Sequence, residues 1–244
     1  MNSTHIGWNV PEARKSGTLL VSFSGIDGAG KTTQIENLIA VLTESGLRVR
    51  LIAFWDDIAT MRRLREVLSH TVFRGEIGIG APDKPVNRKD KNIQNPLTIV
   101  MRMVLCLIDA IRMNFTIARI RNTADADIVV FDRYLYDQLV NLGFRYRLAR
   151  IYTRLLLRFM PHPDIAYLLD ADPVAARIRK PEYPIEFLRN TRACYLAFSK
   201  NAGMNVIQAG SPQEVTNNVR RVLANRLSQS EDWPIPEFLT GTSE

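Results

Sequence analysis

The sequence is poor in cysteine and contains no segment that resembles a secretion signal. Its 244 residues include two cysteines, Cys106 and Cys194, which lie too far apart in the chain to indicate a disulfide framework or a metal site. The N-terminal stretch MNSTHIGWNVPEARKSG has no apolar core of signal-peptide length. Both observations are typical of a protein from a reducing compartment, so we expect a cytoplasmic location.

No apolar run is long enough to span a membrane. The most aliphatic stretch, from Pro96 to Ile120, is interrupted by the charged residues Arg102, Asp109, Arg112 and Arg119. A spanning helix needs about 20 consecutive apolar residues, and the fragments between these charges are much shorter. We therefore expect a long, largely buried helix here and no membrane partner.

Acidic residues are outnumbered by basic ones. The chain has 32 lysines and arginines against 25 aspartates and glutamates, which gives a formal net charge of +7. A basic chain can bind nucleic acid, but the sequence contains no RNP-like, zinc-finger or helix-turn-helix pattern. Small anionic ligands such as phosphates explain the surplus more simply, so nucleic acid is not an expected partner.

Short apolar segments alternate with longer helical patterns along the chain. The segments rich in β-branched or aromatic residues predict buried parallel strands at 19–24, 48–54, 128–131, 165–169 and 205–208. Helical patterns lie at 31–45, 58–72, 96–121, 134–160, 184–202 and 212–227. This alternation predicts an α/β protein with a doubly wound, five-stranded parallel sheet in three α/β/α layers.

We expect one domain, over residues 17–227. Residues 1–16 are predicted to be an N-terminal extension, and residues 228–244, with two prolines, few core residues and no periodicity, a tail or a docking strap. The segment 75–95 is rich in Gly, Pro, Lys and Asn, which predicts a mobile loop.

Residues 25–33, GIDGAGKTT, follow the first expected strand and match the phosphate-binding pattern G-x-x-x-x-G-K-[ST]. Glycines allow successive backbone N–H groups to point at phosphates, and the helix that follows adds the partial positive charge of its N-terminus. Lys31 is expected to reach the β- and γ-phosphates, and the Thr32 hydroxyl to bind Mg²⁺. The loop predicts ATP and Mg²⁺ as cofactors. The nucleotide contacts expected from it are Gly25, Asp27, Gly28, Ala29, Gly30, Lys31, Thr32 and Thr33.

The phosphate loop alone does not separate a kinase from other nucleotide hydrolases. A GTPase would carry an N-K-x-D motif to read guanine, and the sequence has none. A motor or transporter ATPase would come with larger domains or partners. Phosphoryl transfer to a small molecule is therefore the favoured reaction class.

A second motif, Asp132-Arg133-Tyr134, ends the expected strand at 128–131. A carboxylate at the C-terminal end of a central strand can hold Mg²⁺ beside the phosphate loop, and the neighbouring arginine can bind an acceptor phosphate. An ordinary salt-bridged pair at a strand end is the alternative when this motif is taken by itself.

In the order of these motifs the chain resembles the thymidylate kinase family of P-loop nucleoside monophosphate kinases, over about residues 17–227. The resemblance rests on Asp27 in the loop, on Asp132-Arg133-Tyr134, and on Arg112, twenty residues before Asp132. It implies phosphorylation of dTMP to dTDP, with Arg133 and Arg112 on the acceptor nucleotide and Asp27 near its sugar and the metal. It also implies a homodimer formed through the long helices.

Two later segments extend the resemblance. DADPVAARIRK is similar to the family's arginine-bearing lid, here short and near 177–186, and VIQAGSPQEV is similar to the loop that borders adenine, around Ala209, Gly210 and Ser211. The phosphate loop has no basic residue before Lys31, so a lid cation must stabilise the transition-state charge. Arg177 and Arg179 are two residues apart and cannot share one helix face. The resemblance favours Arg179 as the catalytic arginine, with Arg177 beside the nucleotide or in a structural position.

The acceptor side departs from the family's pattern. Ile108 stands where the family has a base-stacking aromatic, and Asp57 where it has an arginine. Trp55 or Tyr136 could supply the missing ring, although each could equally be a core or edge aromatic. An anionic acceptor, dTMP above all, stays the favoured substrate. The alternatives are a kinase of the same fold for a nucleoside, sugar or antibiotic, and a nucleotide-binding regulator without transfer activity.

Overall fold

The computed structural model describes residues 17–59, 96–142 and 147–229. Within these ranges the strands form one five-stranded sheet with the order β2-β3-β1-β4-β5, and every neighbouring pair is parallel. The strands are β1 (Leu19–Ser24), β2 (Val49–Ala53), β3 (Ile128–Asp132), β4 (Ile165–Leu169) and β5 (Asn205–Ile207). The predicted doubly wound parallel sheet is confirmed.

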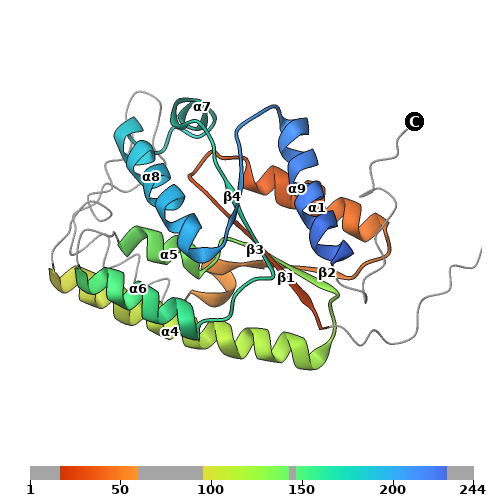
Figure 1. Cartoon of the computed structure of the whole chain (residues 1–244), viewed down its shortest axis with the longest axis horizontal. Coiled ribbons are helices and arrows are strands. Elements are labelled where there is room, and N and C mark those ends of the chain that lie inside the picture. Colours follow the sequence, from red (N-terminus) through yellow and green to blue (C-terminus); the bar gives the residue numbers. More distant parts are fainter. Residues whose placement is uncertain (1–16, 60–95, 143–146, 230–244) are drawn as a thin grey trace, which may run out of the picture.

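Helices cover both faces of this sheet, as Figure 1 shows. One face carries α1 (Lys31–Glu44) and α9 (Pro212–Ser228), which pack against each other. The other face carries α4 (Pro96–Thr123), α5 (Leu135–Leu142), α6 (Arg147–Phe159) and α8 (Ile185–Ala202). A short π-helix, η1 (Phe54–Ile58), follows β2, and α7 (Pro173–Arg179) follows β4. The result is the predicted three-layer architecture.

Alternate residues of each central strand belong to different hydrophobic cores, because successive side chains on a strand point to opposite faces. In β1, Val21 and Phe23 pack with residues of α1 and α9, whereas Leu20 packs with residues of α4, α5 and α8. In β3, Val130 belongs to the first core and Phe131 to the second. Both faces of these strands are buried, which explains their near-continuous apolar sequences.

One predicted helix differs from the structure. The pattern over 134–160 is not a single helix but two, α5 and α6, which occupy different places in the fold. Residues 143–146, which include Gly143, stand between them in the sequence and lie outside the described residues. The apolar pattern continues through both helices because each packs one face against α4, and a shared periodicity does not reveal the break between them.

Other predictions fall where the structure makes no statement. The helix expected over 58–72 overlaps η1 only at Ile58; Ala59 follows it outside any helix, and residues 60–72 lie outside the described residues. The same holds for the extension 1–16, the loop 75–95 and residues 230–244 of the tail. The domain boundaries therefore stay predictions. No helix in the described ranges is long and apolar enough to cross a membrane.

The sheet order brings two sequence motifs together. β1 lies between β3 and β4, and in its register Phe23 is the partner of Asp132. The loop that follows β1 and the turn that follows β3 therefore leave the sheet side by side at its C-terminal edge. From β1 the chain continues to β2 on one side of the sheet, and from β3 it continues to β4 on the other side. In doubly wound sheets ligands bind at such a point, where the strand order reverses, outside the carboxyl ends of the strands.

Candidate functional site

The loop between β1 and α1 has the backbone of a phosphate cradle. Gly28 and Gly30 have φ angles of 81° and 84°, in the left-handed region that favours glycine. Gly30 is the N-cap of α1 and has no side chain to cap it, so the first N–H groups of the helix are left for a ligand. The Lys31 ammonium donates to the carbonyl oxygens of Gly25 and Ile26 at 3.0 and 2.9 Å. Lys31 is thus held inside the loop.

Helix α7 lies directly on this loop. A Cβ atom placed on Gly28 would come within 2.2 Å of the backbone oxygen of Ala176. A Cβ atom on Gly30 would lie 3.9 Å from Nη1 of Arg179, so the guanidinium of Arg179 lies over the loop. Arg177, two residues before Arg179 on the same helix, is half-buried. Both arginines belong to helix α7, as the spacing argument assumed, whereas residues 180–184 of the expected lid are not helical. Arg179 is the arginine whose guanidinium approaches the loop.

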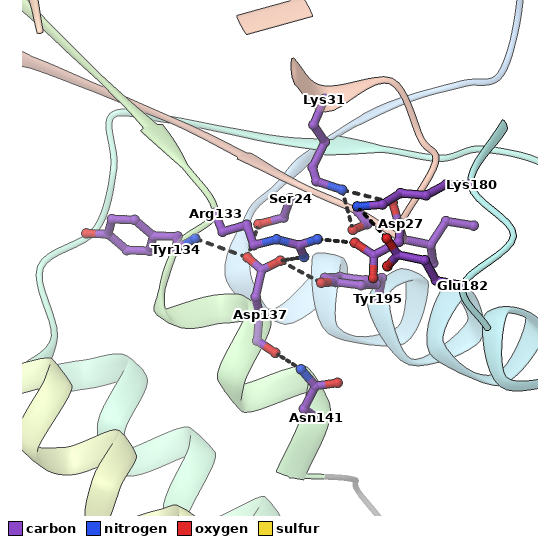
Figure 2. A network of polar contacts seen from close by, with 12 residues as sticks. Ser24, Asp27, Lys31, Arg133, Tyr134, Asp137, Asn141, Lys180, Glu182 and Tyr195 are labelled. Atoms are coloured by element: carbon purple, nitrogen blue, oxygen red, sulfur yellow. Dashed lines mark hydrogen bonds and ion pairs between the residues drawn. The ribbon is translucent and has the colours of Figure 1, made fainter. Parts of the chain in front are cut away.

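The second motif meets the loop through an ion pair. Arg133 stands at the end of β3, where its backbone N–H donates to the Phe23 oxygen at 3.0 Å. Its guanidinium pairs with Asp27 of the phosphate loop, 106 residues away in sequence, and with Asp137 at 3.0 Å. Figure 2 shows the guanidinium between these two carboxylates, with Lys31 beside Asp27. The expected residues Asp27, Lys31 and Arg133 therefore form one cluster.

Burial and charge set the protonation of this cluster. The pKa of the Lys31 ammonium is lowered to about 8, chiefly by burial and then by the neighbouring Arg133, against the opposite effects of Asp27, Asp137 and Asp132. For Arg133, burial acts to lower the pKa, but Asp137 and Asp27 outweigh it, and the pKa rises above its ordinary value. Arg133 is permanently charged, whereas Lys31 can lose its proton at a mildly alkaline pH.

Two residues next to the loop and the Asp-Arg-Tyr turn have side-chain oxygen atoms without a hydrogen-bond partner among the described residues. Thr32 is exposed on the first turn of α1, and Asp132 is half-exposed at the end of β3. One hydroxyl and one carboxylate, completed by substrate phosphates and water, are a set that Mg²⁺ accepts. The described ranges contain no cluster of three His, Cys, Asp or Glu residues that could bind a metal without such a substrate. A metal here would therefore bind together with a nucleotide.

The structure separates the two aromatic candidates. Trp55 is 37% exposed on η1, beyond the C-terminal end of β2, which is compatible with a ligand contact. Tyr136 is 1% exposed, its hydroxyl lies 3.0 Å from Nδ1 of His162, and its ring packs on Tyr134 and Phe198. The predicted substrate contact of Tyr136 is wrong in this structure, because helix α5 turns the ring into the core. Its alternative interpretation as a core aromatic is confirmed.

The remaining predicted residues are exposed or half-buried. Arg112 is exposed on α4, and its side chain has no hydrogen-bond or ion-pair partner among the described residues. Ala209, Gly210 and Ser211 form an exposed turn after β5, and Ser211 caps α9 through a reciprocal capping box with Glu214. Thr33 is exposed on α1 and Ala29 is half-buried in the loop. None of these residues contacts the Asp27–Arg133 pair directly through a hydrogen bond or an ion pair.

Sequence reasoning missed two carboxylates that hold arginines. Asp137 pairs with Arg133 four residues earlier, a spacing typical of ion pairs on one side of a helix. Asp170, after β4, accepts two hydrogen bonds from Arg192 of α8, at 2.5 and 2.8 Å. The first pair had a local signal, the spacing of four. The second joins residues 22 apart, and only the packing of α8 on the sheet brings them together.

Curated proteins similar to this chain share one description. A protein named "Probable thymidylate kinase" from Archaeoglobus fulgidus is 24% identical over 218 residues, which cover 86% of this chain and 97% of the relative. A second of that name from Methanothermobacter thermautotrophicus is 28% identical, over 84% of this chain and 94% of the relative. A "Thymidylate kinase" from Bifidobacterium longum is 31% identical over 66% of this chain and 70% of the relative. A scan against protein-family models found no match.

The contact between α7 and the phosphate loop makes a prediction about two glycines with similar backbones. Gly28 and Gly46 have φ angles of 81° and 77°, but a Cβ atom on Gly46 would meet nothing within 4 Å. Gly46→Ala should lower the free energy of unfolding by about 1–2 kcal/mol, the cost of left-handed backbone for an L-residue. Gly28→Ala should cost a further 1–3 kcal/mol or so, because the added methyl overpacks the Ala176 carbonyl. Urea unfolding of both variants measures the difference, and equal losses would show that α7 does not rest on the loop.

Proposed function

The chain belongs to the thymidylate kinase family, and from that premise we propose that it transfers the γ-phosphoryl group of ATP to dTMP. The observation that carries the proposal is the ion pair between Asp27 of the phosphate loop and Arg133 at the end of β3. An acceptor phosphate bound to Arg133 would lie next to donor phosphates bound to Lys31. The same cleft therefore supports both substrates of a phosphoryl transfer.

Donor binding would use the cradle already formed by the loop. The N–H groups of the loop and of the first turn of α1 would bind the β- and γ-phosphates. Lys31 would exchange the carbonyl oxygens of Gly25 and Ile26, which it contacts in this structure, for phosphate oxygens. The exposed turn at Ala209, Gly210 and Ser211 would border the adenine, with Arg177 on the lid side.

Acceptor binding would use Arg133 and exchange one of its partners. The guanidinium contacts Asp27 through Nη2 and Asp137 through Nη1. A dTMP phosphate would replace Asp27 on Nη2, and the freed Asp27 carboxylate would then turn to the acceptor sugar or the metal. Arg112 on α4 and Trp55 on η1 would contact the acceptor nucleotide from the neighbouring elements.

The reaction needs positioning and charge stabilisation more than a base. An oxygen of the dTMP phosphate, already ionised at neutral pH, attacks the γ-phosphorus of ATP. The bond from that phosphorus to the β-γ bridging oxygen breaks, and the products are ADP and dTDP. Arg179, whose guanidinium lies over Gly30, would stabilise the charge that develops during transfer. The bound Mg²⁺, held by Thr32 and Asp132, would neutralise phosphate charge.

We also propose a homodimer and a cytoplasmic location. Exposed apolar side chains form a stripe along α4 at helical spacing: Val100, Val104, Leu107, Ile111 and Phe115, which are 45–73% exposed. Helix α6, packed against α4, adds Leu148, Ile151, Leu155 and Phe159. Association of two copies across this surface would remove it from water. The cytoplasm is a compartment in which the free thiols of Cys106 and Cys194 persist.

The low pKa of Lys31 predicts how donor binding depends on pH. The ammonium binds phosphate only when protonated, so as the pH rises above about 8 the free enzyme loses that charge. The dissociation constant for ATP should increase by up to about tenfold per pH unit above this value, since the complex must take up a proton. Titration calorimetry from pH 7.5 to 9.5 measures it. The control Lys200→Met should show the same rise of this constant with pH, and Lys31→Met should not. A constant that does not change with pH in the wild type would contradict the assignment of the rise to Lys31.

Arg133→Ala tests the acceptor assignment. The loss of one charged hydrogen-bonding partner, of about 1.5–3 kcal/mol, should reduce kcat/KM for dTMP by roughly 10- to 150-fold. The dissociation constant for ATP should change much less. Arg189→Ala, which removes an exposed arginine paired with Glu186, serves as the control. Unchanged dTMP phosphorylation in Arg133→Ala, with a melting curve like that of the wild type, would exclude Arg133 as the clamp that binds the acceptor phosphate.

An acceptor panel tests the substrate itself. Wild-type enzyme with ATP should convert dTMP faster than AMP, GMP, dCMP, thymidine or a sugar, measured as ADP release. Turnover of dTMP no better than that of the other monophosphates would remove the assignment of dTMP. Turnover of none, with ATP bound, would favour a nucleotide-binding regulator.

The apolar stripe predicts the oligomeric state. Ile111→Glu places a charge in the middle of the stripe and should convert a dimer to a monomer in light scattering coupled to size exclusion. Leu51→Glu is a matched control, because Leu51 on β2 is 50% exposed and Ile111 is 49% exposed. A wild-type protein that runs as a monomer, or a dimer that survives Ile111→Glu, would refute this interface.

A further inference from the structure

Asp137 carries a carboxylate whose hydrogen-bonding capacity is filled. Its side chain is 1% exposed. Oδ1 accepts from Nη1 of Arg133 at 3.0 Å and from the Tyr195 hydroxyl at 2.6 Å. Oδ2 accepts from Oγ of Ser24 at 2.7 Å and from the backbone N–H of Tyr134 at 3.1 Å. An ionised carboxylate offers about four acceptor positions, so none is left for a substrate proton.

Two of the four donors are local, from the turn before α5, and two come from elements that meet Asp137 only in the folded chain. Ser24 ends β1 and immediately precedes the phosphate loop, Tyr134 precedes α5, and Tyr195 belongs to α8. Figure 2 shows them converging on Asp137 from different sides. Burial raises the pKa of Tyr195 well above its ordinary value, and the negative Asp137 raises it further. The Tyr195 hydroxyl therefore stays protonated and keeps donating to Oδ1.

The backbone of Arg133 does not by itself fix its side chain. Arg133 has a φ angle of 68°, in the left-handed region that few residues other than glycine adopt. A long arginine side chain that leaves such a turn has many rotamers, and ordering it on ligand binding costs free energy. The contact of Nη1 with Asp137 removes this freedom before any ligand arrives.

The two carboxylates on Arg133 differ in their access to solvent. The side chain of Asp137 is 1% exposed, while those of Asp27 and Arg133 are 18% and 21% exposed. The contact of the guanidinium with Asp27 is therefore nearer to solvent than its contact with Asp137. We therefore expect the buried contact with Asp137 to persist when a ligand binds, and the more exposed contact with Asp27 to be exchanged.

We propose that Asp137 is a positioning residue that holds Nη1 of Arg133, so that Nη2 is presented to the acceptor phosphate. Asp137 touches neither substrate and acts through Arg133. The inference rests on the proposed function, because it takes Arg133 as the clamp for that phosphate. It adds a residue that lies outside the Asp-Arg-Tyr motif, and its neighbour Tyr195 as the support of the same oxygen.

A double-mutant cycle between Asp137→Asn and Arg133→Ala tests the proposal. In the wild-type background Asp137→Asn should raise the KM for dTMP by about tenfold, the effect of freeing one long side chain and misdirecting its donors. At pH 6.5, well below the pKa of about 8 of Lys31, the dissociation constant for ATP should stay within about twofold, since the Asp137 carboxylate makes its hydrogen bonds outside the phosphate loop. In the Arg133→Ala background the same change should have no further effect on dTMP. An equal rise in KM in both backgrounds would overturn the proposal, because it would show that Asp137 does not act through Arg133.

Two single-atom changes test the same point if Asp137→Asn does not fold. Tyr195→Phe removes the donor on Oδ1, the oxygen that also holds Arg133, and should raise the KM for dTMP only when Arg133 is present. Ser24→Ala removes a donor on Oδ2, on the far side of the carboxylate, and should have a smaller effect on that KM. Equal effects of the two changes on dTMP would contradict a role through Oδ1.

A measurement without substrate separates this inference from the proposed function. In ¹⁵N NMR spectra of the unliganded full chain, the Arg133 side-chain N–H signals, assigned by their loss in Arg133→Ala, should show slow rotation of the guanidinium. Asp137→Asn should make that rotation fast, whereas Asp127→Asn, which removes a carboxylate paired with Arg48 at the opposite edge of the sheet, should not. If dTMP is not phosphorylated, the proposed function fails, and this result still decides whether Asp137 holds Arg133. Fast rotation of the Arg133 guanidinium in the wild type would refute the proposal that Asp137 holds it in place.

Discussion

Mutual compensation of charges is the constraint on which the site depends. Lys31 and Arg133 are cations with little exposure to solvent, and an uncompensated charge there would be strongly unfavourable. Asp27, Asp137 and Asp132 supply the opposite charge from the loop, from α5 and from the end of β3. The ends of β1 and β3 and the start of α5 are thereby tied to one another. The cleft is stable without ligand because each cation already has partners, and it can bind ligand because some of those partners are exchangeable.

Close backbone approach is the second requirement of the site. The glycines of the loop leave room for the carbonyl of Ala176 in α7 and for that of Leu169 at the end of β4, with no space for a side chain. The approach of Ala176 to Gly28 packs α7 against the loop and brings the guanidinium of Arg179 over Gly30. The phosphate cradle and the lid arginine are therefore parts of one packed unit, which is how a loop without a basic residue before Lys31 gains a second cation.

Most of the fold follows from local patterns in the sequence. The strand at 19–24 is predicted to the residue, and α1, α8 and α9 within two residues at each end, because apolar periodicity, glycines and caps are local signals. The pattern over 134–160 fails for the same reason, since two helices that pack on a common neighbour share one periodicity. The phosphate loop was accessible from its motif, whereas spacing showed only that Arg177 and Arg179 face different ways, and the choice of Arg179 came from the family resemblance. The place of Tyr136 was not accessible, because only the orientation of α5 decides that its ring enters the core.

The sequence by itself determined the doubly wound sheet, the phosphate loop with Lys31, and the presence of an Asp-Arg-Tyr turn at the end of a central strand. These depend on interactions within a few residues, whose types and spacings are written along the chain. Only the tertiary structure decided that Asp27 meets Arg133 across 106 residues, that Ser24 of β1 and Tyr195 of α8 donate to Asp137, and that Arg192 holds Asp170. Such contacts arise where strand order and helix packing bring distant segments together, and that arrangement is a property of the whole chain.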